Sequence, residues 1–254
     1  MKTALVFSAG GLFGAWEAGV WRELEGLLAP DIVVGASIGA LNGWMVACGC
    51  SGEEMERRWL DLDVMSRLRV RVPRRALDGW LDSNPLESLV REIYSEHRPL
   101  VEFGVLATET MRLRPRLFRG ADVTWQHLAA SVGIIGVFRQ YRIGGRIYSD
   151  GGLLGALPCW AAAEMGAERI IAINCLPCLP SALMTAGVRT LQKVCSFRPP
   201  QIPEDVEKAE IRPASSLGTV RESLVWSENN TRRWIEQGRC DARAWLQSRP
   251  LKHD

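Results

Sequence analysis

Residues 32–42 read IVVGASIGALN, and this stretch decides the fold. The apolar, β-branched residues at its start predict a short buried strand over 31–34, and residues 40–48 continue as an apolar helix. Between them, Gly35-Ala36-Ser37-Ile38-Gly39 forms a G-x-S-x-G turn, whose glycines let strand and helix approach and leave the serine hydroxyl above the helix N-terminus. This context predicts a nucleophile at Ser37, and a glycine-rich packing turn is the alternative.

The segment before this stretch has the same alternation. Residues 3–7 (TALVF) predict a buried strand, residues 8–14 a loop, and residues 15–28 a helix with apolar residues on one side. The order strand, helix, strand, helix indicates a parallel sheet whose strands are connected by crossover helices. We therefore expect an α/β fold.

The rest of the chain predicts further strands and helices around two less regular segments. Residues near 51–82 are polar and rich in arginine, and residues near 176–210 are rich in proline and lack periodicity. Neither segment contains a clear linker, so residues 1–254 are predicted to form a single domain. Periodicity and turn residues predict helices over 85–94, 124–131 and 160–165, strands over 101–108, 112–118 and 169–174, a hairpin over 141–148, and a closing helical region over 220–246.

Composition and charge are those of a globular protein. Of the 254 residues 47% are hydrophobic and 24% charged, and the net charge of +2 is too balanced for a protein that binds nucleic acid backbones. The uncharged run over 32–52 is long enough to span a bilayer. Its glycines instead favour a buried strand, a turn and a helix.

The seven cysteines favour a reducing compartment. Their number is odd, which favours free thiols in a cytoplasmic protein over a disulfide framework. Cys175 and Cys178 form a C-x-x-C pair, but the sequence has no second pair at zinc spacing. We therefore expect no metal.

A nucleophilic serine needs a base, and the histidines do not supply one. In α/β-hydrolases the histidine follows the serine and the acid, and only His253, next to the last residue, satisfies this order. His97 at a helix end and His127 within a helix have structural explanations. Asp150, which opens the turn Asp150-Gly151-Gly152, is the best carboxylate candidate, and an ordinary Asp-Gly turn is the alternative.

Acyl transfer also needs donors for the negative charge on the reacting oxygen. In residues 10–14 (GGLFG), consecutive glycines can direct backbone N–H groups toward one point and form an anion-binding nest. The same loop could cradle a phosphate. However, Ala9 breaks the glycine pattern of dinucleotide-binding folds, so nucleotide binding is less favoured.

Three blocks together resemble the patatin-like phospholipase family in its compact bacterial form. They are residues 8–15 (SAGGLFGA), 34–42 (VGASIGALN) and 148–154 (YSDGGLL), and the similarity covers most of residues 3–175 in order and spacing. The resemblance implies a three-layer α/β/α fold with a mostly parallel central sheet, and a Ser–Asp dyad that needs no histidine, metal or cofactor. It assigns the nucleophile to Ser37, the base to Asp150, the oxyanion hole to Gly10, Gly11 and Leu12, and motif positions to Gly14, Gly35, Gly39, Gly151 and Gly152.

The expected function is hydrolysis of carboxylic esters in phospholipids or related lipids. Ala9, Phe13 and Ile38 depart from the residues usual in the family, which leaves open an altered specificity or a weak or inactive relative. The alternatives are a small-substrate esterase or acyltransferase, and a catalytically silent lipid- or nucleotide-binding module. The Arg67–Arg75 run alternates arginine with Leu or Val and suggests reversible contact with a membrane surface, with a charge-protected edge strand as the alternative.

Overall fold

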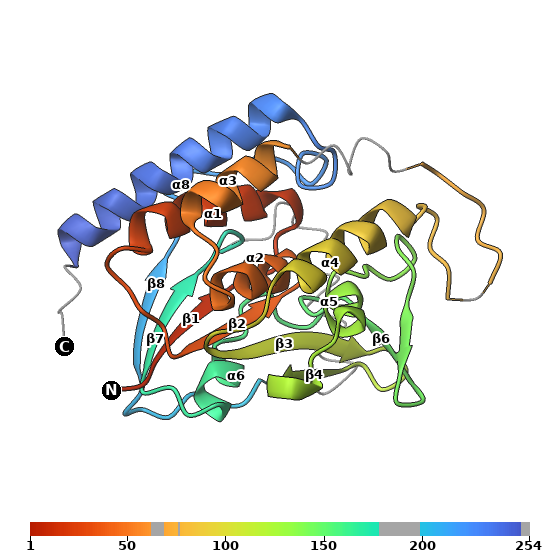
Figure 1. Cartoon of the computed structure of the whole chain (residues 1–254), viewed down its shortest axis with the longest axis horizontal. Helices are drawn as coiled ribbons and strands as arrows, with labels where there is room; N and C mark the ends of the chain where they lie inside the picture. Colours follow the sequence, from red (N-terminus) through yellow and green to blue (C-terminus); the bar gives the residue numbers. More distant parts are fainter. Residues whose placement is uncertain (62–68, 76, 178–198, 250–254) are drawn as a thin grey trace.

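The computed structural model describes residues 1–61, 69–75, 77–177 and 199–249. Its centre is an eight-stranded sheet in the order β5-β6-β3-β2-β1-β7-β8, with β4 paired to β3 (Figure 1). Five neighbouring strands, from β3 to β8, are parallel, and the other pairings are antiparallel, which confirms the mostly parallel sheet. The strands are β1 (Thr3–Phe7), β2 (Ile32–Ala36), β3 (Glu102–Glu109), β4 (Arg114–Arg119), β5 (Tyr141–Ile143), β6 (Arg146–Ser149), β7 (Arg169–Ile173) and β8 (Glu207–Ile211).

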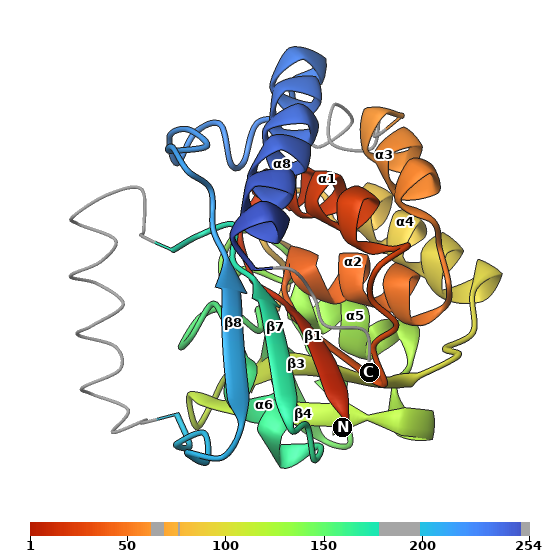
Figure 2. The same ribbon diagram turned by 90° about the vertical axis from the view of Figure 1, so that its left-hand side faces the viewer.

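Helices cover both faces of this sheet. Leu5 and Phe7 of β1 belong to the large apolar cluster under the helices of one face, whereas Ala4 and Val6 pack with α6 (Cys159–Glu164) on the other. This arrangement, seen from the side in Figure 2, confirms the three-layer α/β/α fold. The first face carries α1 (Gly14–Leu24), α2 (Ile38–Ala47), α3 (Gly52–Leu60), α4 (Asn84–Glu96), α5 (Trp125–Ser131) and α8 (Glu228–Ser248).

The uncharged run over 32–52 is part of the core, as predicted. Every residue of β2 is buried, and α2 is buried from Gly39 to Ala47. Within the described ranges, every helix is too short or too polar to cross a bilayer. The residues of three expectations lie outside these ranges, namely Arg67 with Leu68, Cys178, and His253.

Two elements, α3 and β8, are not among the helices and strands predicted from the sequence. The polar helix α3 begins after Ser51, whose Oγ accepts a hydrogen bond from the Glu54 N–H at 3.2 Å and caps the helix. Strand β8, at the edge of the sheet, reads EKAEI. Its charged residues leave no alternation of apolar and polar residues that would predict a strand. The closing helix also starts later than expected, at Glu228, because residues 220–225 form turns and a bend.

Candidate active site

Ser37 occupies the tight turn between β2 and α2. Its backbone has φ 53° and ψ −128°, a left-handed conformation that residues other than glycine rarely adopt. Its N–H donates to Ser131 Oγ at 2.9 Å. A Cβ atom on Gly35 would lie 2.2 Å from the Gly39 carbonyl oxygen, and one on Gly39 would lie 2.3 Å from the Ser8 carbonyl oxygen. Both glycines are therefore required for this strand and helix to meet.

Asp150 directly follows β6 and is fixed through its own backbone. Its N–H donates to the Gly133 carbonyl at 3.0 Å, and its carbonyl accepts from Thr108 Oγ1 at 2.8 Å. The Gly152 N–H donates to carboxylate atom Oδ1 at 2.8 Å. The other carboxylate atom, Oδ2, is buried and has no hydrogen-bond partner among the described residues. Asp150 therefore presents one satisfied and one free oxygen.

Ser131, the last residue of α5, connects the two sequence blocks. Its Oγ accepts from the Ser37 N–H, and its carbonyl accepts from the Gly151 N–H at 3.0 Å. Ser131 is fully buried. Sequence reasoning did not single out this residue, and its place at the end of a short helix gives no signal of such a role.

Ser37 and Asp150 lie close enough to interact, and both are largely buried, with 7% and 9% of their surface exposed. Burial raises the pKa of the Asp150 carboxyl to about 6, while the Ser37 hydroxyl and the Gly152 N–H lower it. The hydroxyl is thus close enough to act on the carboxyl, although Oδ2 lacks a hydrogen bond of ordinary geometry. At pH 7 most of this carboxyl is ionised and able to accept a proton.

The glycine-rich loop after β1 presents unpaired backbone donors. Among the described residues, nothing accepts a hydrogen bond from the N–H of Gly10 or Gly11. The Leu12 N–H, in contrast, donates to the Ser223 carbonyl at 2.9 Å. Gly11 has φ +59°, and a Cβ there would lie 2.4 Å from the same Ser223 oxygen. The loop therefore offers two free amides, with the third engaged by the segment before α8.

The remaining motif glycines lie where the parts of the site touch. A Cβ on Gly14 would lie 2.7 Å from Ile38 Cγ1, which joins the start of α1 to the elbow. A Cβ on Gly151 would lie 2.2 Å from the Leu106 carbonyl oxygen, and one on Gly152 2.3 Å from Ala9 Cβ. The structure therefore brings the three sequence blocks into direct contact.

A buried carboxyl group lies behind the glycine-rich loop. Glu17 of α1 is fully buried, and its Oε1 accepts from both the N–H and the Oγ of Ser8, each at 3.1 Å. Its Oε2 accepts from Asn42 Nδ2 at 2.9 Å, and Asn42 Oδ1 accepts from Trp59 Nε1 at 3.1 Å. Burial raises the pKa of Glu17 to about 8. Sequence reasoning missed this network, although one acid within the apolar residues 15–21 was a signal.

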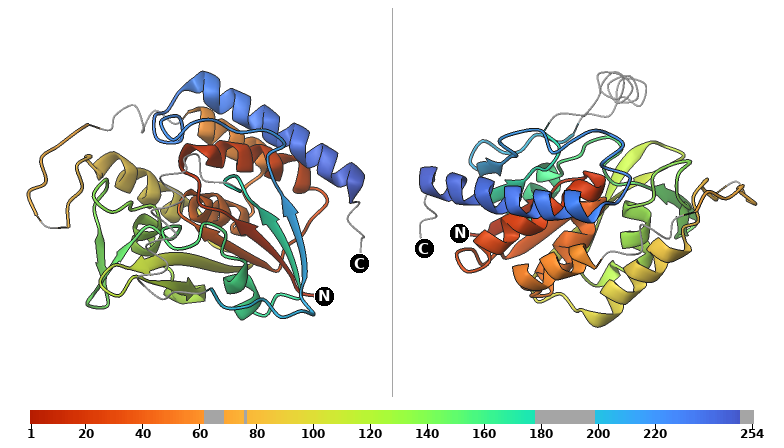
Figure 3. Two further views of the ribbon diagram at one scale, coloured as in Figure 1. Left: turned by 180° about the vertical axis from the view of Figure 1, so that it is seen from behind. Right: turned by 90° about the horizontal axis from the view of Figure 1, so that it is seen from above.

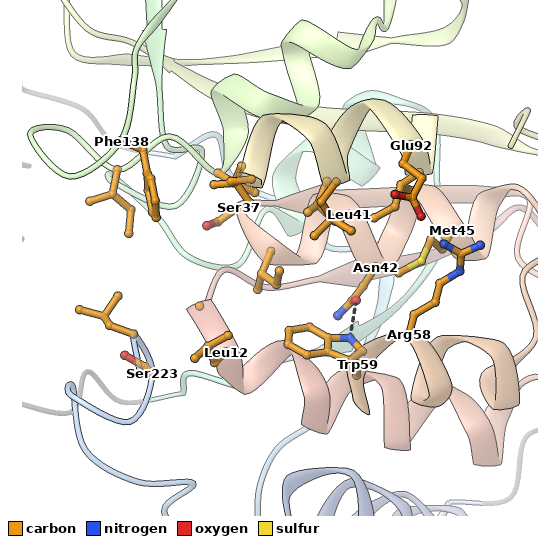
Figure 4. A pocket seen from close by; sticks show the side chains of 18 of the residues that line it. Leu12, Ser37, Leu41, Asn42, Met45, Arg58, Trp59, Glu92, Phe138 and Ser223 are labelled. Carbon is orange, nitrogen blue, oxygen red and sulfur yellow. Dashed lines mark hydrogen bonds between the residues drawn. The ribbon is translucent and has the colours of Figure 1, made fainter. Parts of the chain in front are cut away.

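An apolar cavity of about 490 Å³ extends from Ser37 along α2. Figure 4 shows Ser37, Phe138 and Ser223 at one end, Leu41 in the middle, and Met45 with Arg58 and Glu92 at the other. The volume is within the range of small-molecule binding sites. Its walls are mainly leucine, isoleucine, valine and aromatic side chains, and its charged residues are Arg57, Arg58, Asp61 and Glu92.

The two described histidines, His97 and His127, are engaged elsewhere. His127 forms a capping box with Thr124 on α5, and burial lowers its pKa. His97 contacts the Ile93 carbonyl through Nδ1 at 3.0 Å. Ligand atoms of Cys50, Glu54 and His97 lie within 4.8 Å of one another, the types that bind transition metals. Arg58, however, donates to Glu54 Oε1 at 3.0 and 3.1 Å, and its guanidinium opposes a second cation there.

The fold is α/β, and the elbow places a serine on a strained turn between a central strand and a helix. The profile of the patatin-like phospholipase family matches residues 5–163, more than half of the chain. The chain therefore belongs to this family, whose class is lipid hydrolase, and the resemblance seen in the sequence is confirmed.

Curated proteins and a solved structure are also similar to this chain. Uncharacterized NTE family proteins of Mycobacterium bovis and Mycobacterium tuberculosis are 29% identical over 185 residues, which cover 68% of this chain and 49% of theirs. The chain thus spans about half the length of these curated relatives. The crystal structure of VipD from Legionella pneumophila has a TM-score of 0.56 at 11% identity, over 97% of this chain and 67% of VipD. That likeness is one of fold.

Proposed function

We propose that this protein hydrolyses carboxylic ester bonds of phospholipids or related lipids, with Ser37 as nucleophile and Asp150 as its base. One observation carries the proposal. A serine on a strained elbow lies at one end of an apolar cavity, close enough to interact with the carboxyl group of a buried aspartate whose Oδ2 has no partner among the described residues. Membership in a phospholipase family supports a lipid substrate. The odd number of cysteines favours the cytoplasm as its location.

In the proposed mechanism, Ser37 Oγ attacks the ester carbonyl carbon while its proton passes to Asp150 Oδ2. The carbonyl π electrons move to the oxygen, and the N–H groups of Gly10 and Gly11 donate to this oxyanion. When the carbonyl re-forms, the bond to the leaving alcohol breaks and Asp150 returns the proton to that alcohol. Water, deprotonated by Asp150, then releases the fatty acid from Ser37 through the same steps in reverse.

The N–H of Leu12, unlike those of Gly10 and Gly11, is not free to donate to the oxyanion. Its N–H is bound to Ser223 in the described structure, so it contributes to the oxyanion hole only if that hydrogen bond opens. The two glycine amides need no such change. We therefore assign the first two donors to the glycines and treat Leu12 as a third donor that substrate binding would have to release.

A serine-reactive fluorophosphonate tests the nucleophile directly. The wild type should be labelled, Ser37→Ala should not, and Ser95→Ala, which removes an exposed serine near the end of α4, should be labelled as the wild type is. Asp150→Asn should lower ester hydrolysis by about 10⁴-fold or more, as loss of a catalytic group does in serine hydrolases. Labelling that persists in Ser37→Ala would overturn the assignment. Product analysis on a mixed lipid panel separates phospholipid hydrolysis from a small-ester esterase or an acyltransferase.

A further inference from the structure

Exposed apolar side chains gather around one end of the cavity. Ten large hydrophobic residues are exposed within the described ranges, and four of them, such as Leu27 beyond α1, are scattered over the molecule. Single exposed residues need no explanation, but a cluster does. The other six are Val70, Val72, Trp80, Ile135, Leu224 and Val225, and we call them the mouth surface.

Backbone contacts attach this surface to the lining of the cavity. The Trp80 N–H donates to the Gly136 carbonyl at 3.0 Å, and the next residue, Leu81, lines the cavity. Val70 pairs with Leu81 in an antiparallel bridge. Leu224 also lines the cavity, and it belongs to the segment that binds Leu12. The mouth surface therefore adjoins the lining of the cavity, and Figure 4 places Ser223, the neighbour of Leu224, at the same end as Ser37.

The same surface carries unpaired positive charge. Arg69, Arg74 and Arg75 are exposed and form no ion pair with a described residue. Arg71, between them, is paired with Asp78 at 3.5 Å. Figure 3 shows the chain around residues 69–82 extending from the body beyond the start of α4, on the side of the turn that precedes α8. Free cations next to exposed Trp and Val are the combination that binds the headgroup region of an anionic bilayer.

We propose that the mouth surface docks onto anionic lipid bilayers and places the opening of the cavity against the headgroups. The apolar side chains enter the interface, where tryptophan is favoured, and the three free arginines contact lipid phosphates. The positive charge of the arginines favours an anionic bilayer over a second copy of this chain as the partner of this surface. In a dimer formed through this surface, the arginines of the two copies would repel each other. This inference rests on the proposed function for its purpose, but docking can be measured without turnover.

Vesicle flotation with the full chain carrying Ser37→Ala tests docking while the lipid stays intact. Binding to vesicles that contain phosphatidylglycerol should exceed binding to phosphatidylcholine alone and should fall at high salt. Replacing Arg69, Arg74 and Arg75 by Gln should weaken binding to the anionic vesicles about a hundredfold, at about fivefold per arginine. Trp80→Ser with Val72→Ser should weaken it at least tenfold. The matched control Leu27→Ser, an exposed apolar residue far from the cavity, should bind as the parent does.

The same surface variants with Ser37 intact separate docking from catalysis. Hydrolysis of a soluble p-nitrophenyl ester should stay near the wild-type rate, because these side chains do not line the cavity, whereas hydrolysis of vesicle lipid should fall. If the wild type is inactive on both substrates, the proposed function fails even when docking is observed. Equal flotation of parent and variants overturns the docking proposal. The docking proposal is also overturned if the wild type does not bind vesicles but forms a dimer, and Trp80→Ser dissociates that dimer.

Discussion

A series of esters with increasing acyl length tests whether the cavity along α2 holds the acyl chain. Leu41 and Met45 follow Ser37 at intervals of about one helical turn, and all three line the cavity (Figure 4). The eight residue-to-residue steps from Ser37 to Met45 span about 12 Å of helix. An extended chain advances about 1.2 Å per bond, as in an extended peptide, so this length holds about ten carbons.

The expected magnitude follows from burial. Each methylene transferred from water contributes about 0.8 kcal/mol, which raises kcat/KM about fourfold when the interaction is kept in the transition state. Beyond about ten carbons the chain passes Arg58 and Glu92, where it gains no apolar contact, so the series should level off. Leu41→Trp fills the cavity about 6 Å from Ser37 and should move the levelling to about five carbons.

The assay is kcat/KM for soluble p-nitrophenyl esters measured on the wild type and Leu41→Trp. If Leu41→Trp hydrolyses the shortest ester at the wild-type rate, the elbow and the proposed dyad are intact in the variant. The difference between the two proteins should appear only for longer chains, because the indole occupies space that is open in the wild type. A wild-type series without dependence on length, or one that levels at the same length in Leu41→Trp, would show that the acyl chain lies elsewhere.

Three further measurements follow from the site. Asp150 must be ionised to act as a base, and its pKa is raised to about 6, so kcat/KM should rise about tenfold per pH unit below pH 6 and level above it. Gly152→Ala should cost roughly 1–3 kcal/mol of stability and reduce activity, because its Cβ would lie 2.3 Å from Ala9, whereas Gly155→Ala, which meets nothing within 4 Å, should be neutral in denaturation and activity assays. Glu17 keeps its proton more tightly in the folded state, so the stability it contributes is complete below its unfolded pKa near 4.5 and is lost as pH rises to about 8. Denaturant titrations should show the free energy of unfolding falling by about 1.4 kcal/mol per pH unit up to that value, and Glu17→Gln, which cannot ionise, should lack this slope.

The sequence was sufficient for the parts of the fold that depend on local patterns. β1 and β2 are continuous apolar runs because both faces of a central parallel strand are buried, and the elbow between β2 and α2 has a motif of its own. The polar helix α3 has only Met55, Trp59 and Leu60 as large apolar residues, and the charged edge strand β8 has no clear alternation. They form because neighbouring elements bury one side of them, and that information is not local.

In the candidate site, too, some residues follow from local sequence patterns and others do not. Ser37, Asp150 and the two loop glycines could be found from motifs and from a resemblance, since each stands in a short stretch with a characteristic turn. Ser131 and Glu17 could not be assigned, because their importance comes from hydrogen bonds to residues distant in the chain. A serine at a helix end and one acid in an apolar helix acquire meaning only when the contacts are known.

The buried carboxyl groups of Asp150 and Glu17 have different roles in the proposed site. An aspartate at its ordinary pKa of 3.8 is a weak base, and burial raises Asp150 to about 6, close to the 6.5 of an ordinary histidine. In the proposed mechanism a carboxylate can therefore take the role that imidazole has in many serine hydrolases, provided that bulk water does not solvate it and Oδ2 remains unpaired until the hydroxyl approaches. Glu17, raised to about 8, is mostly protonated at pH 7 and adds little negative charge behind the loop that must bind an oxyanion. If Glu17 were ionised, the same hydrogen bonds would hold the loop but repel the charge that forms in front of it.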